Sequence, residues 1–96
     1  MPAYVIASVT DARDAEKLAE YRRGNTDVVA AHGGRFLVRG GPHESLEGDW
    51  DPVRLVIMEF PDADAARAWY GSDGYAPLRE LRQSASDTDI VLVEGV

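Results

Sequence analysis

Four short apolar runs, joined by two helical segments and one loop, constrain the fold of this chain most strongly. The runs cover residues 3 to 10, 34 to 40, 53 to 60 and 89 to 96. Each is rich in β-branched, leucine or aromatic residues and has the length of a strand. A helical segment follows the first run, a loop joins the second to the third, and another helical segment precedes the fourth. The predicted order of elements is therefore β-α-β-β-α-β.

The two helical segments carry recognisable start and stop signals. The first is expected to start at Asp11, a favourable N-cap, and to end at the glycine pair of residues 33 and 34. Its apolar residues recur at helical spacing: Leu18, Tyr21, Val28 and Val29. The second is expected to be capped by Asp62, to be interrupted by GSDG, and to resume over residues 75 to 83.

This order predicts an α+β chain with the ferredoxin-like fold. We expect a four-stranded, mostly antiparallel sheet with the helices on one face and the first and third strands parallel in its middle. Ninety-six residues are enough for one core, so residues 1–96 are expected to form a single domain.

Both faces of the predicted sheet are apolar. In the second run, Phe36 and Val38 are expected on one face, while Arg35, Leu37 and Arg39 share the other. Two helices on crossovers of the same hand cover only one face of a sheet, so the other face needs a cover. We therefore expect a homodimer, a dimeric α+β barrel, in which two copies of the sheet face each other.

The charge balance and the missing motifs narrow the classes of partner. With 10 basic and 17 acidic residues the net charge is −7, which disfavours binding to nucleic acid or to a membrane surface. The chain has no cysteine, and His32 and His43 lie in different elements, so no metal site is expected. No nucleotide-binding motif is present, and no cofactor is expected. No export signal or membrane span is visible, so a cytoplasmic location is expected.

Several stretches together resemble a known bacterial family. They are AYVIASVTD, HGGRFLVRGGP, LEGDW, VIMEFPDADAARAWYGSDGYAPLRELR and VLVEGV. They are similar to the domain-of-unknown-function family thirteen-thirty, among the dimeric α+β barrels. The resemblance implies the ferredoxin-like fold and the face-to-face dimer, and it supplies no function. Relatives in the wider superfamily include cofactor-independent monooxygenases, haem-degrading enzymes, lactone isomerases and peroxidases. The chain departs from the family pattern at Asn25, usually apolar, and at His32, usually tyrosine.

Arg39 is the leading candidate for ligand binding. It is expected on the face that enters the dimer interior, where a guanidinium needs a partner because it does not readily deprotonate. One interpretation is a fork that grips a small carboxylate or enolate. The alternative is an ion pair with Glu44, Glu47 or Asp49, either from its own loop or across the dimer. Our expectation is that these carboxylates partly hold it.

Glu59 is a candidate base or ligand contact, because it lies among apolar residues that would raise its pKa. A hairpin register with residue 35 opposite residue 59, 37 opposite 57, and 39 opposite 55 would instead let Arg35 neutralise it. This register favours the ion pair.

Asn25, His32 and Trp69 form a second candidate set. Asn25 and His32 are two helical turns apart and are expected to line a pocket between helix and sheet, into which Trp69 also points. Alternatively, His32 complements the helix dipole and Asn25 marks an irregularity beside Gly24. Trp50 and Trp69 are interpreted as packing anchors.

Arg82, seven residues after Tyr75, is placed at a pocket mouth or, more simply, on the surface. These residues support a cofactor-independent enzyme or a binder of small anionic or oxygenated ligands, with one pocket per subunit. A dimeric module without an open pocket is the alternative.

Overall fold

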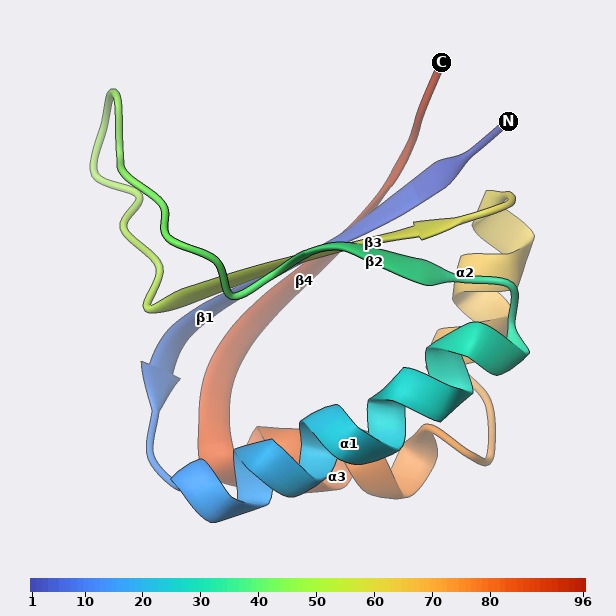
Figure 1. Ribbon diagram of the computed structural model, residues 1–96, viewed down its shortest axis with the longest axis horizontal. Helices are drawn as coiled ribbons and strands as arrows, with labels where there is room; N and C mark the ends of the chain where they lie inside the picture. The colour runs from blue at the N-terminus through green and yellow to red at the C-terminus, as the bar shows by residue number, and fades with distance from the viewer.

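The computed structural model describes residues 1–96 as one curved sheet with three helices on one side (Figure 1). The elements in chain order are β1 (Ala3–Ala12), α1 (Ala15–Ala31), β2 (Arg35–Arg39), β3 (Arg54–Phe60), α2 (Ala63–Tyr70), α3 (Ala76–Ala85) and β4 (Ser86–Glu94). The predicted order is confirmed, with the second helical segment divided into α2 and α3 by the turn at residues 71 to 75.

The strands lie in the order β2-β3-β1-β4, as in the ferredoxin-like fold. β1 pairs with β3 in antiparallel register, and the β1–β4 and β2–β3 pairs are antiparallel as well. The expectation that the first and third strands run parallel was therefore wrong. The hairpin connection makes β3 antiparallel to β2, and β3 then lies between β2 and β1, which are joined by a crossover.

The helix caps follow the sequence signals closely, with one shift. Asp14, rather than Asp11, caps α1, and its side chain accepts a hydrogen bond from the Lys17 N–H at 3.1 Å. Asp11 instead continues β1. Asp62 caps α2, as predicted, by accepting from the Ala65 N–H at 2.8 Å. The strand thus extends past its apolar run before the chain turns into the helix.

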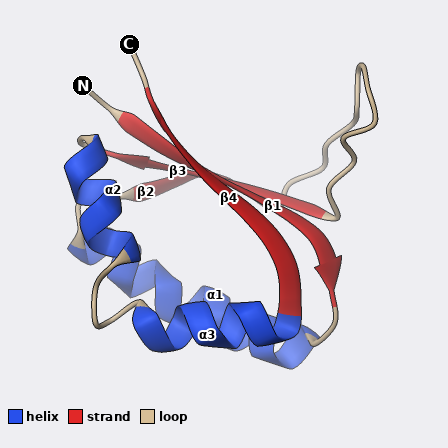
Figure 2. Ribbon diagram, turned by 180° about the vertical axis from the view of Figure 1, so that it is seen from behind, coloured by secondary structure: helices blue, strands red, loops and turns tan.

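The core lies between the sheet and the ends of the helices. Its largest fully buried side chains are Trp69, Tyr75, Phe60, Met58 and Val29. α2 packs on β1, β3 and β4, whereas α1 packs mainly on α3 (Figure 2). Because α1 is supported by a helix rather than by the sheet, space remains between α1 and the strands.

A bulge in β2 changes which side chains face that space. Phe36 lies opposite Met58, but the next pair joins Val38 to Ile57, so Leu37 is an extra residue. Beyond the bulge, Arg39 lies opposite Val56. Val56 and Met58 point toward the helices, so Phe36 and Arg39 do too. The predicted pairs 37–57 and 39–55, the shared face of Phe36 and Val38, and the assignment of Arg39 to the dimer face were therefore wrong.

The other face of the sheet is open and apolar. Exposed side chains on it include Leu37, Val91 and Val93, with 46%, 56% and 44% of their surface accessible. The loop between β2 and β3 rises from this side, away from the helices, as do both termini (Figure 1). Trp50 of this loop donates from Nε1 to the Ser8 hydroxyl of β1 at 3.0 Å while staying 58% exposed, so it is only a partial anchor. None of the three helices has the length and apolar character of a membrane span.

Candidate functional site

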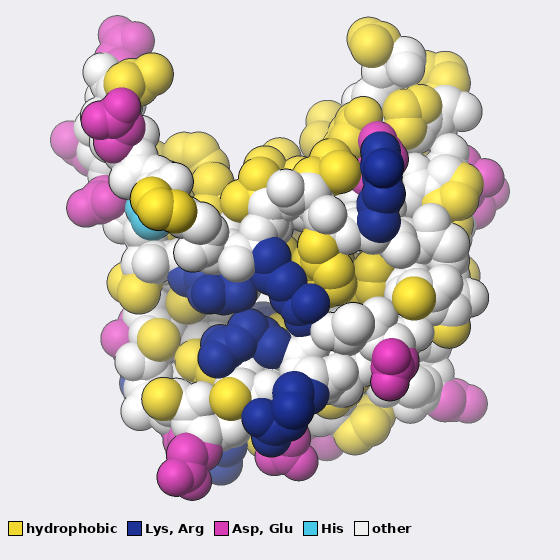
Figure 3. Space-filling model, in the orientation of Figure 1, with side chains coloured by type: hydrophobic (Ala, Val, Ile, Leu, Met, Phe, Trp, Pro, Cys, Tyr) yellow, Lys and Arg dark blue, Asp and Glu magenta, His cyan; other side chains and the backbone are white.

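A cavity of about 420 Å³ occupies the space between the sheet and the helices α1 and α3. All four strands and both helices contribute to its wall, and basic side chains gather in the hollow between the sheet and α1 (Figure 3). The apolar part of the wall includes Ala7, Val9, Leu18, Phe36, Val53, Val56 and Met58. The charged part consists of Arg13, Arg22, Arg39, Arg54 and Arg82, and the wall contains no aspartate, glutamate or histidine.

These arginines differ in whether a carboxylate neutralises them. Arg13 is paired with both Asp11 and Asp87, each at 3.0 Å. Arg22, Arg39, Arg54 and Arg82 make no ion pair. The whole chain has a net charge of −7, whereas this cavity carries four guanidinium groups without carboxylate partners and is therefore locally positive. Its field attracts anions.

Arg39 is held by neutral groups. Its Nη2 donates to the Arg22 carbonyl at 2.7 Å and to the Thr26 hydroxyl at 2.9 Å, both on α1. Its guanidinium carbon lies 3.8 Å from the centre of the Phe36 ring, a cation–π contact. The expected ion pair with Glu44, Glu47 or Asp49 was wrong, because the bulge turns Arg39 to the side opposite the one from which their loop rises.

Arg54 is the second cation at this end. Its Nη2 donates to the Arg39 carbonyl at 3.3 Å, and its guanidinium lies directly over Gly40. Gly40 has φ +76°, which favours glycine, and a Cβ at this position would overlap the guanidinium. A glycine at the end of β2 thus lets Arg54 lie against the backbone beside Arg39.

Arg39 and Arg54 lie close enough to Arg22 for the positive charges to repel one another. Burial, followed by repulsion from Arg22, lowers the pKa of Arg39. Burial, then repulsion from Arg22 and Arg39, lowers the pKa of Arg54. Both groups stay protonated at neutral pH because an arginine pKa starts near 12.5. A bound anion would relieve this repulsion.

At the α3 side, a polar chain leads from the core to the cavity. Trp69 Nε1 donates to Asn25 Oδ1 at 3.0 Å, which directs the Asn25 amide nitrogen toward the Tyr21 hydroxyl at 3.5 Å. The hydroxyls of Tyr21 and Tyr75 share a hydrogen bond at 2.8 Å. Burial, reinforced by Tyr75, strongly raises the pKa of Tyr21. Tyr21 is therefore a neutral hydrogen-bonding group at physiological pH, and not a base.

The residues predicted as a site are only partly brought together. Arg39 and Asn25 line the same cavity. Trp69 lies behind it, fully buried, and reaches it only through Asn25. His32 lies outside the cavity, at the C-cap of α1, with Nδ1 2.9 Å from the Val28 carbonyl. Gly24 causes no break, since α1 is continuous there.

Glu59 lies on the open face and is bound by Arg35, with 2.8 Å between Nε and Oε1. The predicted pairing of residues 35 and 59 and the ion pair are both confirmed. Glu59 is thus remote from the arginine-lined cavity.

Three cavity arginines had no clear signal in the sequence. Arg22 and Arg54 follow no motif. Arg82 was expected at a pocket mouth or on the surface, but it is buried, with only 6% of its surface exposed. The one available signal was the helical spacing on α1. Leu18, Tyr21, Arg22 and Asn25 are three or four residues apart, so they share one side of the helix, and this places Arg22 beside the cavity residues.

Comparisons with known proteins agree with this architecture. The family model described as "Domain of unknown function (DUF1330)" matches residues 2–96. No curated protein matches the chain. Among solved structures, a protein of unknown function from Rhodopseudomonas palustris is 22% identical with TM-score 0.80, over 99% of this chain and 82% of that one. SnoaB, a cofactor-independent oxygenase from Streptomyces nogalater, is 14% identical with TM-score 0.67, over 99% and 93%. A dimeric ferredoxin-like protein of unknown function from Jannaschia sp. CCS1 is 12% identical with TM-score 0.74, over 99% and 100%.

Proposed function

We propose that this chain, which belongs to the family Domain of unknown function (DUF1330), binds a small organic anion in the arginine-lined cavity. The ligand has an apolar or aromatic body and at least one carboxylate or enolate oxygen. The body contacts the aliphatic and aromatic wall, and the oxygen is bound by Arg39 and Arg54 with Arg22 nearby.

The observation that carries this proposal is the set of guanidinium groups without carboxylate partners. Clustered like charges repel, and partial burial, as at Arg54, adds to the free-energy cost unless something neutralises them. Arg39 and Arg54 share one end of an apolar cavity, and Arg22 contributes to the repulsion at both. A cavity of about 420 Å³ with an apolar wall and a few convergent polar groups has the size and composition of a small-ligand site. An organic anion supplies the missing charge.

The proposal is tested with 2-naphthoate as a probe, by calorimetry and thermal unfolding at low chloride concentration. We expect 2-naphthoate to raise the melting temperature of the wild type. The Arg39→Ala variant should keep its fold and lose most of this stabilisation. Arg23→Ala is the matched control, since it removes an exposed cation of the same helix that does not line the cavity. Equal losses in both variants, or no stabilisation of the wild type by aromatic mono- or dicarboxylates, would show that the cavity is not an anion site.

A homodimer with facing sheets is the second part of the proposal. Leu37, Val91 and Val93 are exposed on the open face, where they would contact water in a monomer. An isologous pairing of two such faces removes them from water. Solved structures of the same fold from Jannaschia sp. CCS1 and Thermobifida fusca are described as dimeric. In this arrangement each cavity stays on the helix side of its own sheet, so one ligand binds per subunit.

Cofactor-independent chemistry on the bound anion is the second candidate function. Guanidinium groups that bind an enolate stabilise the carbanion character that reaction with oxygen requires. SnoaB, with the same fold, is a cofactor-independent oxygenase. The present cavity wall supplies cations and the neutral Tyr21 hydroxyl but no carboxylate or imidazole. It therefore suits a substrate that is already ionised. Oxygen uptake with such a bound anion, absent from Arg39→Ala, is the measurement that separates this activity from simple binding.

A further inference from the structure

The guanidinium of Arg82 stands apart from the other arginines of the cavity. It belongs to α3, on the β4 side of the sheet, whereas Arg39 and Arg54 lie at the opposite side, on β2 and β3. The side chain lines the cavity and is 6% exposed. β2 and β4 are separated by three strand spacings, or about 14 Å. The elements that carry these cations therefore lie on opposite sides of the apolar wall.

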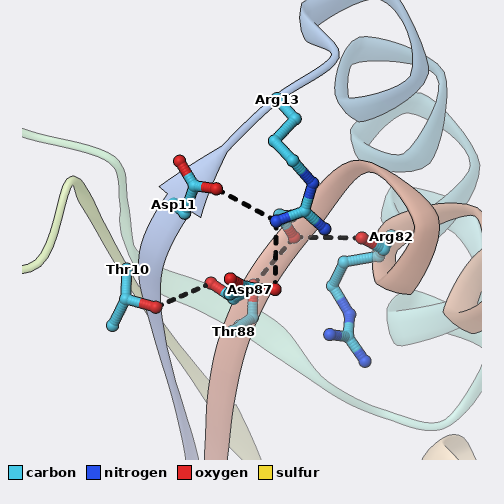
Figure 4. Close-up of polar contacts among 7 residues, drawn as sticks. Thr10, Asp11, Arg13, Arg82, Asp87 and Thr88 are labelled. Carbon is cyan, nitrogen blue, oxygen red and sulfur yellow. Dashed lines mark hydrogen bonds and ion pairs between the residues drawn. The ribbon is translucent and has the colours of Figure 1, made fainter.

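Arg82 is the one buried side chain with an unsatisfied polar atom. Its Nε is buried and has no hydrogen-bond partner. The nearby carboxylates do not serve it, because Asp11 and Asp87 are both taken by Arg13 (Figure 4). Only the backbone carbonyl of Arg82 takes part in that network, by accepting from the Ser86 hydroxyl at 3.0 Å, while the guanidinium points away from it. The Tyr21 ring centre lies 6.0 Å from the guanidinium carbon, so even the aromatic contact is distant.

A buried guanidinium whose Nε–H has no acceptor is a costly arrangement. Buried donors are nearly always satisfied, and arginine does not readily escape the cost by losing its proton. The neighbouring polar side chain, Ser86, has its hydroxyl engaged by the Arg82 carbonyl and by Thr88 at 2.9 Å. Tyr21, at the same end, is already hydrogen bonded to Tyr75. The Tyr21 hydroxyl is close enough to act on Arg82, but the Arg82 Nε itself has no acceptor in the protein, which points to an acceptor that comes with the ligand.

We propose that the ligand is an elongated anion with acceptor oxygens at both ends; this inference rests on the proposed function. One end is bound by Arg39 and Arg54, and the other, a second carboxylate or a phenolate, is bound by Arg82. The apolar wall between them, which includes Val56 and Met58, contacts a flat hydrocarbon body. The substrate class is thus an aromatic dianion rather than a simple aromatic monocarboxylate.

Two probes of the same ring system test this class. 2-Naphthoate has one carboxylate, and naphthalene-2,6-dicarboxylate has one at each end of the same body. By calorimetry on the full chain, we expect the dicarboxylate to bind the wild type roughly tenfold more tightly or better, the range of one charge-assisted hydrogen bond. In Arg82→Met this advantage should shrink to less than about twofold, while the affinity for 2-naphthoate changes little. Arg82→Lys, which keeps a cation, should retain part of the advantage.

A second measurement needs no ligand. Because the Arg82 Nε is buried without an acceptor in the free protein, Arg82→Met should melt at the same temperature as the wild type or higher. A clear loss of stability in Arg82→Met would show a structural role and overturn the assignment. The assignment also fails if 2-naphthoate binds in an Arg39-dependent way but the dicarboxylate binds no better, or if its advantage survives in Arg82→Met. If neither probe binds the wild type, the proposed function itself falls.

Discussion

Trp69 donates its indole N–H to Asn25 Oδ1 across 3.0 Å of the interior, joining α2 to α1. The two side chains are 0% and 3% exposed, so no water replaces either partner. This bond fixes the rotation of the Asn25 amide and thereby its contact with Tyr21 at the cavity. Asn25, predicted as a ligand contact, therefore links the buried core to the cavity wall through its side chain.

Replacing Asn25 should destabilise the fold. In Asn25→Leu the indole N–H loses its acceptor and remains buried, which costs about 1–3 kcal/mol. Urea unfolding should show this loss, whereas Asp27→Ala, an exposed change on the same helix, should shift the free energy of unfolding by less than about 0.5 kcal/mol. A loss in Asn25→Leu no larger than that of the control would mean that the Trp69 bond contributes little.

Gly40 is expected to control the position of Arg54. A Cβ in Gly40→Ala overlaps the Arg54 guanidinium and sits at a positive φ, so we expect a lower melting temperature and a cost of about 1 kcal/mol or more. The displaced Arg54 should also weaken binding of 2-naphthoate. Gly41→Ala is the matched control, because a Cβ there meets nothing within 4 Å. Binding that is unchanged in Gly40→Ala would remove Arg54 from the anion site.

The open face of the sheet should decide the oligomeric state. A charge in Val91→Asp would be buried in a face-to-face dimer, so this variant should elute and scatter light as a monomer while the wild type is a dimer. Ala68→Asp, exposed on the helix side, should remain dimeric. A wild type that is monomeric at micromolar concentration would refute the dimer, and dissociation by Ala68→Asp would assign the interface to the other side.

The buried Tyr21 hydroxyl predicts a specific loss of stability at alkaline pH. Its pKa is raised in the folded state above the ordinary value of 10.0, so folding favours the protonated form. This stabilisation is complete below pH 10, and it declines above pH 10 because only the unfolded chain then releases the proton. The slope approaches about −1.4 kcal/mol per pH unit.

The check is the free energy of unfolding of the wild type and of Tyr21→Phe, measured by urea at several pH values from 8 to 11. Tyr21→Phe should start lower, having lost the bond to Tyr75, and should fall less steeply above pH 10. Parallel curves for the two proteins would contradict the assigned shift. Tyr4→Phe, at a half-buried position on the open face, serves as the control for general loss of a phenol.

Much of the fold could be predicted because its signals are local. Apolar runs, the Asp62 cap and the helical spacing act over a few residues, and they defined the elements and their order. The apolar character of both sheet faces was also readable, and so was the pairing of Arg35 with Glu59, since register and face alternate with period two.

The arrangement of the candidate site could not be predicted from the sequence, because it depends on the bulge in β2 and on the packing of α1 against α3. One extra residue at Leu37 reverses the alternation, and no pattern of apolar residues encodes a bulge, so Arg39 was expected on the wrong face. Arg54 and Arg82 come from β3 and α3 and meet one cavity only because α1 rests on α3 and leaves the sheet uncovered. The sequence by itself determined which elements form and where charge is available; long-range packing decided that these cations share one space without carboxylates between them.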